Sequence, residues 1–457
     1  MSSKTEKYIK REEEFIFTTT LDDGLVLRTG NGVHFVDLDD REYIDATSQI
    51  SLLDLGYKPK EVVRFITEQM QSGVHSCISA DWAFVNKTSD GIEISRAALA
   101  EKLIKISDRV MPYPNKRVIF EVSGATAVNA AARIAAITNL RQKGKWNTQK
   151  LGELFLHRNI FIPSHHDPFR FSLLGFKNAF HGRHGEAKLL TDSRAVHYWG
   201  PSSSCAVGRL DLPTGDTNMG FYLNDVACLI EERLSNYAPV VAFFFEPIQG
   251  EGGINIPDAE GLRQLVDYLR SRGIYIIADE IQSGLGRTGK MFACEHFGIQ
   301  PDMIILSKSL GAGLPIGAVI ADADKFPDLE PGMHSGSMHC SPLSCAAALA
   351  NLPLLEKHCF SSLKRGKYAL SRFEEMKTKF PDIISDVRGK GLFIGIEFFE
   401  TLERDKIRKI TRTVYKKRGL LLAPCGEKTI RFCPPININL TDLGEALYIF
   451  ELALKSL

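Results

Sequence analysis

The sequence predicts an α/β protein whose mostly parallel sheet is covered by helices. Short apolar runs typical of buried strands alternate with segments that carry one apolar helical face. Two of the runs, 274–278 and 302–306, end directly on Asp279–Glu280 and on Ser307–Lys308. Ligands of open α/β sheets bind beyond the carboxyl ends of the strands. A carboxylate and a lysine at two such ends therefore indicate a cofactor bound between them.

The composition is that of a globular protein with more than one domain. The length of 457 residues favours about two or three domains, and 44% hydrophobic with 24% charged residues is ordinary. A net charge of +1 gives no reason to expect nucleic acid or an anionic membrane as a partner. Residues 1–15 lack the apolar core of a secretory signal, and no apolar run is long enough to span a membrane. Nine scattered cysteines without a CxxC pair indicate reduced thiols in a cytoplasmic protein.

The elements can be anticipated in chain order. Residues 1–31 are expected to form an arm that leads to a hairpin, because residues 33–37 alternate polar and apolar before an acidic turn. Helices are expected over 60–71, from 126 to about 139, and between a capping Asp258 and Gly273. Strands are expected over 118–122 and 239–245, whereas 141–215 is less regular. After residue 338 the alternation returns as a smaller α+β region.

The stretch from Tyr275 to Gly317 carries a resemblance to a known family. It reads YIIADEIQSGLGRTGKMFACEHFGIQPDMIILSKSLGAGLPIG. The DE pair, the Gln and Gly after it, the GRTGK run and the glycine-rich tail after the lysine resemble the signature of class III aminotransferases. These enzymes use pyridoxal 5′-phosphate (PLP) on fold type I. Other motifs extend the resemblance over nearly the whole chain.

The resemblance implies a division of the chain and an assembly. Residues 1–75 would form the N-terminal arm and part of the small domain, 76–335 the large PLP-binding domain, and 336–457 the C-terminal small domain. The large domain would hold the mostly parallel sheet, and the α+β small domain would be built from both ends of the chain. A homodimer or a dimer of dimers with active sites at the interface is expected.

Lys308, Asp279 and Gln282 are the candidates for the reaction centre. A primary amine such as that of Lys308 can form a Schiff base with an aldehyde cofactor, and desolvation keeps it reactive. Asp279 would hold the pyridine nitrogen protonated, so that the ring accepts electrons. By resemblance, Gln282 would contact the ring hydroxyl, whereas Glu280 is expected to be structural. The alternatives are a solvated surface lysine and an aspartate that caps a strand end.

Further residues are expected to hold the cofactor. Ser123, Gly124 and Ala125 form a turn between a strand and a helix, where free N–H groups suit a phosphate. Phe180, in the motif Phe-His-Gly-Arg, would stack on the pyridine ring; the alternative is an ordinary core phenylalanine. Ser337 aligns with a threonine that reaches the phosphate across the dimer interface in the family.

Four residues are candidates for substrate binding. In relatives that act on ω-amino acids, the arginine matching Arg183 binds the carboxylate remote from the amine. Glu251, in EPIQGEGG, and Arg431 match a pair that opens to let the arginine grip an α-carboxylate; a fixed structural ion pair is the alternative. Ile50 lies in the segment SQIS, which is similar to 4-aminobutyrate and lysine 6-aminotransferases.

The chain also departs from the family pattern. Thr126 replaces a usual acidic residue, Asn129 replaces a second one, and His339–Cys340 replace a usual Gly-Gly pair. No metal is expected, because the sequence His165-His166-Asp167 has no companion ligands at a set spacing and is typical of a solvated loop.

The leading hypothesis is a PLP-dependent aminotransferase that moves the ω-amino group of a 4-aminobutyrate, ornithine or lysine type of donor to a 2-oxo acid, with 2-oxoglutarate as the expected acceptor. The first alternative is an amino-acid racemase or epimerase, since some relatives on this scaffold return the proton to the opposite face. A non-enzymatic scaffold or PLP-dependent regulator is a third hypothesis. It would ordinarily lose Lys308 or Asp279, and both are present.

Overall fold

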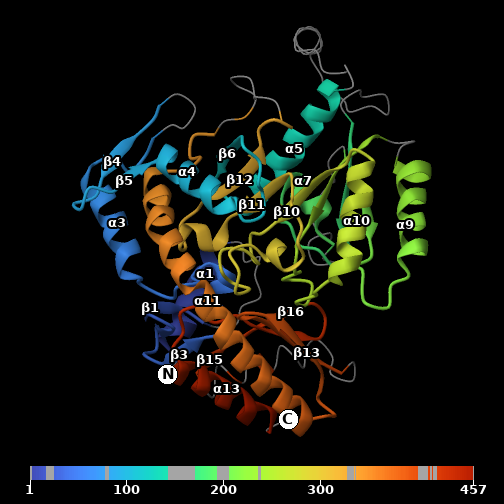
Figure 1. Cartoon of the computed structure of the whole chain (residues 1–457). Helices are drawn as coiled ribbons and strands as arrows, with labels where there is room; N and C mark the ends of the chain where they lie inside the picture. Colours follow the sequence, from blue (N-terminus) through green and yellow to red (C-terminus); the bar gives the residue numbers. More distant parts are fainter. Residues whose placement is uncertain are drawn as a thin grey trace.

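A seven-stranded sheet forms the centre of the computed structural model (Figure 1). The structure describes residues 3–16, 25–77, 82–142, 170–192, 205–234, 238–326, 334, 336–399, 410–411, 414 and 419–455. In spatial order the strands of the sheet are β6 (Lys116–Glu121), β12 (Gly317–Asp322), β11 (Met303–Leu306), β10 (Tyr275–Asp279), β9 (Val240–Phe245), β7 (Ser172–Phe176) and β8 (Ala206–Leu210).

The sheet is mostly parallel, as predicted. Strands β11, β10, β9, β7 and β8 pair in parallel, and β12 alone runs antiparallel to its two neighbours β11 and β6. The register sets Asp279 of β10 beside Ile305 of β11. The carboxyl ends of these two strands therefore bring Asp279 and Lys308 to one edge of the sheet.

Helices cover both faces of this sheet. In β9, Phe243 and Phe245 stack on one face with ring centroids 5.4 Å apart, and Phe244 packs into a second cluster on the other face. This is why the strand reads as an unbroken apolar run. The helices are α4 (Arg96–Ser107), α5 (Gly124–Gln142), α7 (Gly185–Leu190), α9 (Met219–Cys228), α10 (Ala259–Ser271) and α11 (Pro342–Lys379). Helix α3 (Lys60–Gln71) packs against α11. Among the described helices, none is long and apolar enough to cross a membrane.

Two smaller four-stranded sheets are built from the two ends of the chain. The first contains β1 (Leu27–Asn31), β2 (His34–Asp37), β3 (Glu42–Asp45) and β15 (Leu420–Leu421), and the second contains β13 (Ile384–Lys390), β14 (Phe393–Phe398), β17 (Thr429–Phe432) and β16 (Ala423–Cys425). A separate hairpin pairs β4 (Val85–Lys87) with β5 (Glu93–Ser95). The long helix α11 runs from beside the central sheet to these sheets, where it packs near α13 (Leu440–Leu454) (Figure 1).

Most elements lie where the sequence predicts them. Helix α3 spans the predicted 60–71, and α10 begins after Asp258, whose carboxylate accepts a hydrogen bond from the N–H of Gly261. The N-terminal arm differs from the prediction because it contains helix α1 (Lys4–Phe15) and strand β1. A capping box between Ser3 and Glu6 begins α1, and the N–H of Lys4 donates to Asp39.

A buried guanidinium joins the central sheet to both ends of the chain. Arg287, in the loop after β10, is fully buried and forms an ion pair with the buried Asp54. Its Nη1 also donates to the carbonyl oxygens of Leu392, at 2.9 Å, and Pro434, at 2.6 Å. A buried charge pair is costly to break, because the remaining charge is left uncompensated.

We expect Arg287→Leu to lower the free energy of unfolding by about 3–5 kcal/mol, because it leaves the Asp54 carboxylate buried without a counter-charge. The double variant Arg287→Leu/Asp54→Leu should recover a large part of this loss. The matched control is Arg109→Leu, at an exposed ion pair with Glu356, which should change stability by about 1 kcal/mol or less. Denaturant unfolding of the variants checks this, and equal losses for Arg287 and Arg109 would contradict it.

Candidate active site

Lys308 lies directly after β11 at the start of a 3-10 turn, Lys308–Gly311. Its φ of +33° is unusual for a residue with a side chain. Around it, the hydroxyl of Ser307 donates to the Ile316 carbonyl oxygen at 2.6 Å, and Nδ2 of Asn351 donates to the Ser309 carbonyl oxygen at 2.5 Å. These bonds hold the turn that presents the lysine.

Four charged side chains act on Lys308. Burial, then the positive charge of Arg431, lowers the pKa of Lys308 below its usual value. The carboxylates of Glu251, Glu246 and Asp279 act in the opposite direction. The net shift favours the neutral amine, which is the nucleophilic form and the form that can accept a proton.

Asp279 is buried at the end of β10 and is held from two sides. Its Oδ2 lies 2.7 Å from Nδ1 of His181, and its Oδ1 accepts a hydrogen bond from the N–H of Ile281 at 3.0 Å. Nε2 of His181 is buried without a hydrogen-bond partner among the described residues. Sequence reasoning missed this role of His181, and its place inside the Phe-His-Gly-Arg motif was the available signal.

Helix α5 begins at Gly124, two residues before the predicted start, so Gly124 and Ala125 lie in its first turn, where the N–H groups have no acceptor within the helix. Ser123 and Thr126 hold the turn, because the N–H of Thr126 donates to Oγ of Ser123 at 3.2 Å and the N–H of Ser123 donates to Oγ1 of Thr126 at 3.1 Å. Gly124 packs so closely on Ile281 that a Cβ would lie 2.7 Å from its Cδ1. The turn therefore lies close to Asp279.

The Phe-His-Gly-Arg segment packs on the same turn. A Cβ on Gly182 would lie 2.6 Å from Cβ of Ala125. Phe180 is half-buried, and its N–H donates to Oε1 of Glu246 at 2.9 Å. The guanidinium of the exposed Arg183 lies 5.6 Å from the centroid of the Phe180 ring. An aromatic face and a cation thus occupy one side of the site.

Arg431 and Glu251 form the predicted pair. Nη1 of Arg431 lies 3.3 Å from Oε2 of Glu251 and donates to Oε1 of Gln282 at 3.4 Å. The Arg431 side chain is 1% exposed and that of Glu251 is 40% exposed. Burial lowers the pKa of Arg431, but Glu251 outweighs that effect and the net shift is upward. Nε2 of Gln282 and Nε of Arg431 are buried without hydrogen-bond partners among the described residues.

Ile50 lies in a left-handed turn. Residues Ser48 to Ser51 all have φ between 48° and 61°, and Ile50 is 43% exposed. The buried Asp45 holds this turn, because it accepts hydrogen bonds from the N–H of Thr47 at 2.8 Å and from the N–H of Gln49 at 3.3 Å. Left-handed residues that carry side chains are strained, and such strain clusters at functional sites.

The remaining predicted residues are placed as follows. Ser337 is exposed in the turn at 336–340. Within the described part of the chain, it contacts none of the other predicted site residues. Glu280 is structural, as expected: it accepts hydrogen bonds from the N–H groups of Ala293 and Cys294 and from Ser283. Asn129 is also structural, because its Oδ1 accepts a bond from the N–H of Ala187. The sequence His165-His166-Asp167 lies outside the described residues.

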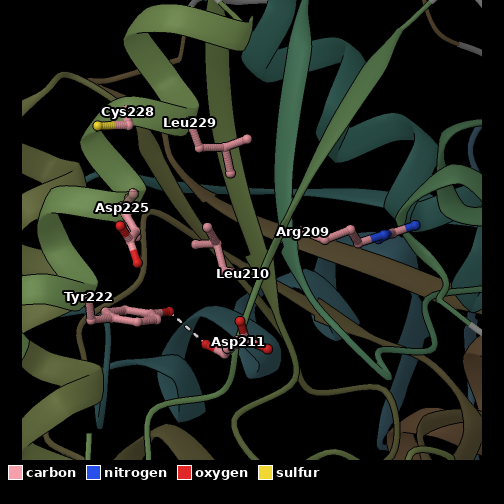
Figure 2. Close-up of a pocket in the computed structure, with 8 residues that line it drawn as sticks. Arg209, Leu210, Asp211, Tyr222, Asp225, Cys228 and Leu229 are labelled. Carbon is pink, nitrogen blue, oxygen red and sulfur yellow. Dashed lines mark hydrogen bonds between the residues drawn. The ribbon is translucent and has the colours of Figure 1, made fainter. Parts of the chain in front are cut away.

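A separate cavity of about 280 Å³ lies at the edge of the central sheet, between β8 and α9. Figure 2 shows Tyr222 donating to the carbonyl oxygen of Asp211 there, with Arg209 extending away from both. No predicted site residue lines this cavity.

Comparison with known proteins identifies the family. The family described as aminotransferase class-III matches residues 20–454. This chain is a class III aminotransferase. It is 33% identical over 430 residues to a leucine/methionine racemase of Thermococcus litoralis, covering 92% of this chain and 88% of the relative. It is 30% identical over 461 residues to an ornithine aminotransferase of Halalkalibacterium halodurans, covering 100% of both.

The solved structures agree with the fold. An ornithine aminotransferase of Toxoplasma gondii, described as having partial PLP occupancy at its active site, superposes with a TM-score of 0.81 at 25% identity. The alignment covers 99% of this class III aminotransferase and 95% of that chain. The fold type I prediction is therefore confirmed, and so is the prediction of a PLP-dependent aminotransferase.

The residues of this aminotransferase fit PLP. The N-terminus of α5 offers N–H groups to a phosphate, and the buried Asp279 offers a carboxylate to a protonated ring nitrogen. The buried Nε2 of Gln282 has no partner in the protein and would gain one from the ring hydroxyl. Lys308 offers its amine and Phe180 its ring face.

The pKa of Glu246 gives a pH-dependent test of the site. Burial raises this pKa from 4.5 to about 7, against the effect of His181. Because Glu246 binds a proton more tightly in the folded protein than in the unfolded chain, its contribution to stability is full below pH 4.5 and is lost as the pH rises to about 7. We expect Glu246→Gln to flatten this fall in the free energy of unfolding.

The control for this measurement is Glu61→Gln at an exposed glutamate, which should leave the slope unchanged. Denaturant unfolding at several pH values between 4.5 and 7 gives the slopes. An unchanged slope in Glu246→Gln would show that Glu246 is ionised throughout this range. Glu280, whose pKa burial raises to about 6, keeps part of the slope in both variants.

Proposed function

We propose that this enzyme moves the ω-amino group of a 4-aminobutyrate, ornithine or lysine type of amino acid to a 2-oxo acid, with 2-oxoglutarate as the acceptor. The observation that carries the proposal is the presence of two arginines in different settings. The exposed Arg183 lies beside Phe180, and the buried Arg431 lies among the charges that act on Lys308. Two cations suit substrates whose carboxylates lie at two distances from the reacting amine.

Lys308 is the proposed catalytic base and cofactor anchor. Bound PLP supplies an electron sink for negative charge at the substrate carbon. With PLP bound, the neutral amine of Lys308, favoured by burial and by Arg431, would accept the proton from that carbon and pass it to the cofactor. Asp279 offers its carboxylate to the ring nitrogen, while His181 and the N–H of Ile281 fix its orientation.

The pair of Glu251 and Arg431 is the proposed selector between the two half-reactions. When paired, Glu251 neutralises Arg431, so that the ω-amine of a donor can enter the site. When Glu251 swings out, Arg431 is free to bind the α-carboxylate of the oxo acid in a bidentate manner. The burial supports this division of roles: Glu251 is 40% exposed and has solvent to move into, whereas Arg431 is 1% exposed.

The proposal extends to assembly and location. We infer a homodimer whose interface completes each site, because Ser337 is exposed and its expected phosphate contact is to the neighbouring subunit's cofactor. The proposed cytoplasmic location rests on the nine scattered cysteines, which contain no CxxC pair.

Lys308→Ala should abolish transfer of the amino group, because it removes the amine that would anchor the cofactor and take the proton. The measurement is glutamate formation from 2-oxoglutarate with 4-aminobutyrate, ornithine or lysine as donor. Lys177→Ala, at an exposed lysine, is the control and should retain full activity. Residual activity of the Lys308 variant near that of the control would refute the assigned role.

The racemase relative makes amino-acid racemisation the second candidate function. The same lysine and aspartate serve both reactions, so the products decide between them. Incubation of the enzyme with a single L-amino acid and no oxo acid, followed by chiral analysis, separates the two. Accumulation of the D-enantiomer without net loss of amine would replace transamination as the main activity.

Arg183→Ala should lower kcat/KM about tenfold to hundredfold for ω-amino acids with a distal carboxylate, because a charge-assisted contact is lost. It should change kcat/KM far less for a donor amine that lacks that carboxylate. Arg133→Ala, at an exposed arginine on α5, controls for the loss of surface charge. Equal effects on donors with and without the carboxylate would show that Arg183 binds no carboxylate.

A further inference from the structure

Three potential metal ligands converge at the carboxyl end of β6. Oε1 of Glu121 lies 2.6 Å from Nε2 of His334, and Oε2 lies 3.3 Å from Nε2 of His339. The ligand atoms of the three residues all lie within 4.8 Å of one another. The Glu121 side chain is 4% exposed, and each histidine side chain is 17% exposed. The cluster is therefore sheltered rather than a solvated surface group.

The contact between His334 and Glu121 is short but poorly directed. Nε2 of His334 is buried and makes no well-directed hydrogen bond in the described part of the chain, although Glu121 is so near. Buried polar atoms nearly always have a partner. The two imidazoles also lie together, with ring centroids 5.5 Å apart and planes tilted by 34°. A cation between the three residues would give each facing nitrogen and oxygen a partner.

The local backbone is shaped around the cluster. A Cβ on Gly336 would overlap the His339 imidazole, so glycine at 336 allows the ring to turn toward Glu121. Glu121 itself is fixed as the last residue of β6, paired with Gly317 of β12. Thr126, in the first turn of α5, forms a hydrogen bond with the same carboxylate. Two departures from the family pattern, Thr126 and His339, therefore meet at one carboxylate.

We propose that Glu121, His334 and His339 form a binding site for a divalent transition-metal ion, Zn²⁺ in particular. A ligand set of two imidazoles and one carboxylate favours Zn²⁺ over Mg²⁺ or Ca²⁺, which prefer oxygen ligands. The spacing His-x₄-His falls within the range of zinc sites. Tetrahedral zinc holds its ligand atoms about 3.4 Å apart, since its bonds are about 2.0–2.1 Å long. The separation of 3.3 Å between His339 and Glu121 already matches this value, whereas the 2.6 Å between His334 and Glu121 would have to widen when the ion binds.

The three protein ligands leave one coordination position for water. An ion at the site would fasten the turn at 336–340 to the end of β6, two residues before Ser123. It would thus order the segment that contains Ser337. The metal site does not include Lys308, and metal binding is measured without a turnover assay. The metal-site proposal and the proposed function can therefore fail independently.

The test uses the full chain purified with its cofactor, treated with a chelator and dialysed. Titration with Zn²⁺ against a chromophoric competitor, with metal counted by atomic emission, should show one ion per chain. His334→Gln and His339→Gln should each weaken Zn²⁺ binding about tenfold or more. Removing only a residue that hydrogen-bonds to a metal ligand already lowers metal affinity about tenfold or more. His358→Gln, at a half-buried histidine on α11 outside the cluster, is the matched control and should bind as the parent does.

Co²⁺ provides the second readout. Its visible absorption should report nitrogen and oxygen ligation in a low-coordinate site in the parent protein, and the bands should disappear in His339→Gln. Circular dichroism and PLP absorbance verify that each variant is folded. If a histidine variant folds poorly, the stoichiometry and Co²⁺ spectrum of the parent decide alone. Less than one ion per chain at micromolar Zn²⁺, or equal affinity in the parent and both histidine variants, would overturn the proposal.

Discussion

The buried guanidinium of Arg287 is the interaction on which the shape of the site depends. It pairs with Asp54 from the N-terminal segment and donates to the carbonyl oxygens of Leu392 and Pro434 from the C-terminal segment. A buried cation tolerates few alternative positions, because each lost partner leaves uncompensated charge. Lys308 also lies near Asp54: burial raises the pKa of the Asp54 carboxyl group, and the positive charge of Lys308 acts against this rise. The small sheets, the loop after β10 and the reactive lysine are thereby fixed relative to one another.

The site gathers several charges, yet none of its carboxylates is held in an ion pair with Lys308 among the described contacts. Burial and the positive charge of Arg431 lower the pKa of Lys308, and nearby carboxylates raise it. The net shift is downward and favours the neutral amine. Asp279 is instead engaged with His181 and a backbone N–H, which keeps it from pairing with the lysine. Each carboxylate has its own partner, so the amine of Lys308 stays available for chemistry. A tight ion pair between Lys308 and Asp279 would hold the lysine charged and inactive.

The sequence predicted which residues follow the strands, but it did not predict the contacts between residues that are far apart in the chain. Parallel strands bring their carboxyl ends to one edge, so the apolar runs before Asp279 and Lys308 were enough to place both residues together. Local signals also located α10, because a capping aspartate and a terminal glycine mark its ends. The partners of Arg287 were beyond reach, since they lie far away in sequence and two of them are backbone carbonyls. For the same reason no local pattern joined Glu121 to His334 and His339.

The two arginines that frame the proposed substrate site differ in solvent exposure, and this difference has a consequence for selectivity. Arg431 is buried, so a carboxylate that replaces Glu251 there is bound in a low-dielectric setting where the charge pair is strong. Arg183 is exposed, and its contact with a carboxylate is weakened by water and salt. The buried arginine should therefore discriminate sharply between substrates with and without an α-carboxylate. The exposed arginine should accept distal carboxylates over a range of chain lengths.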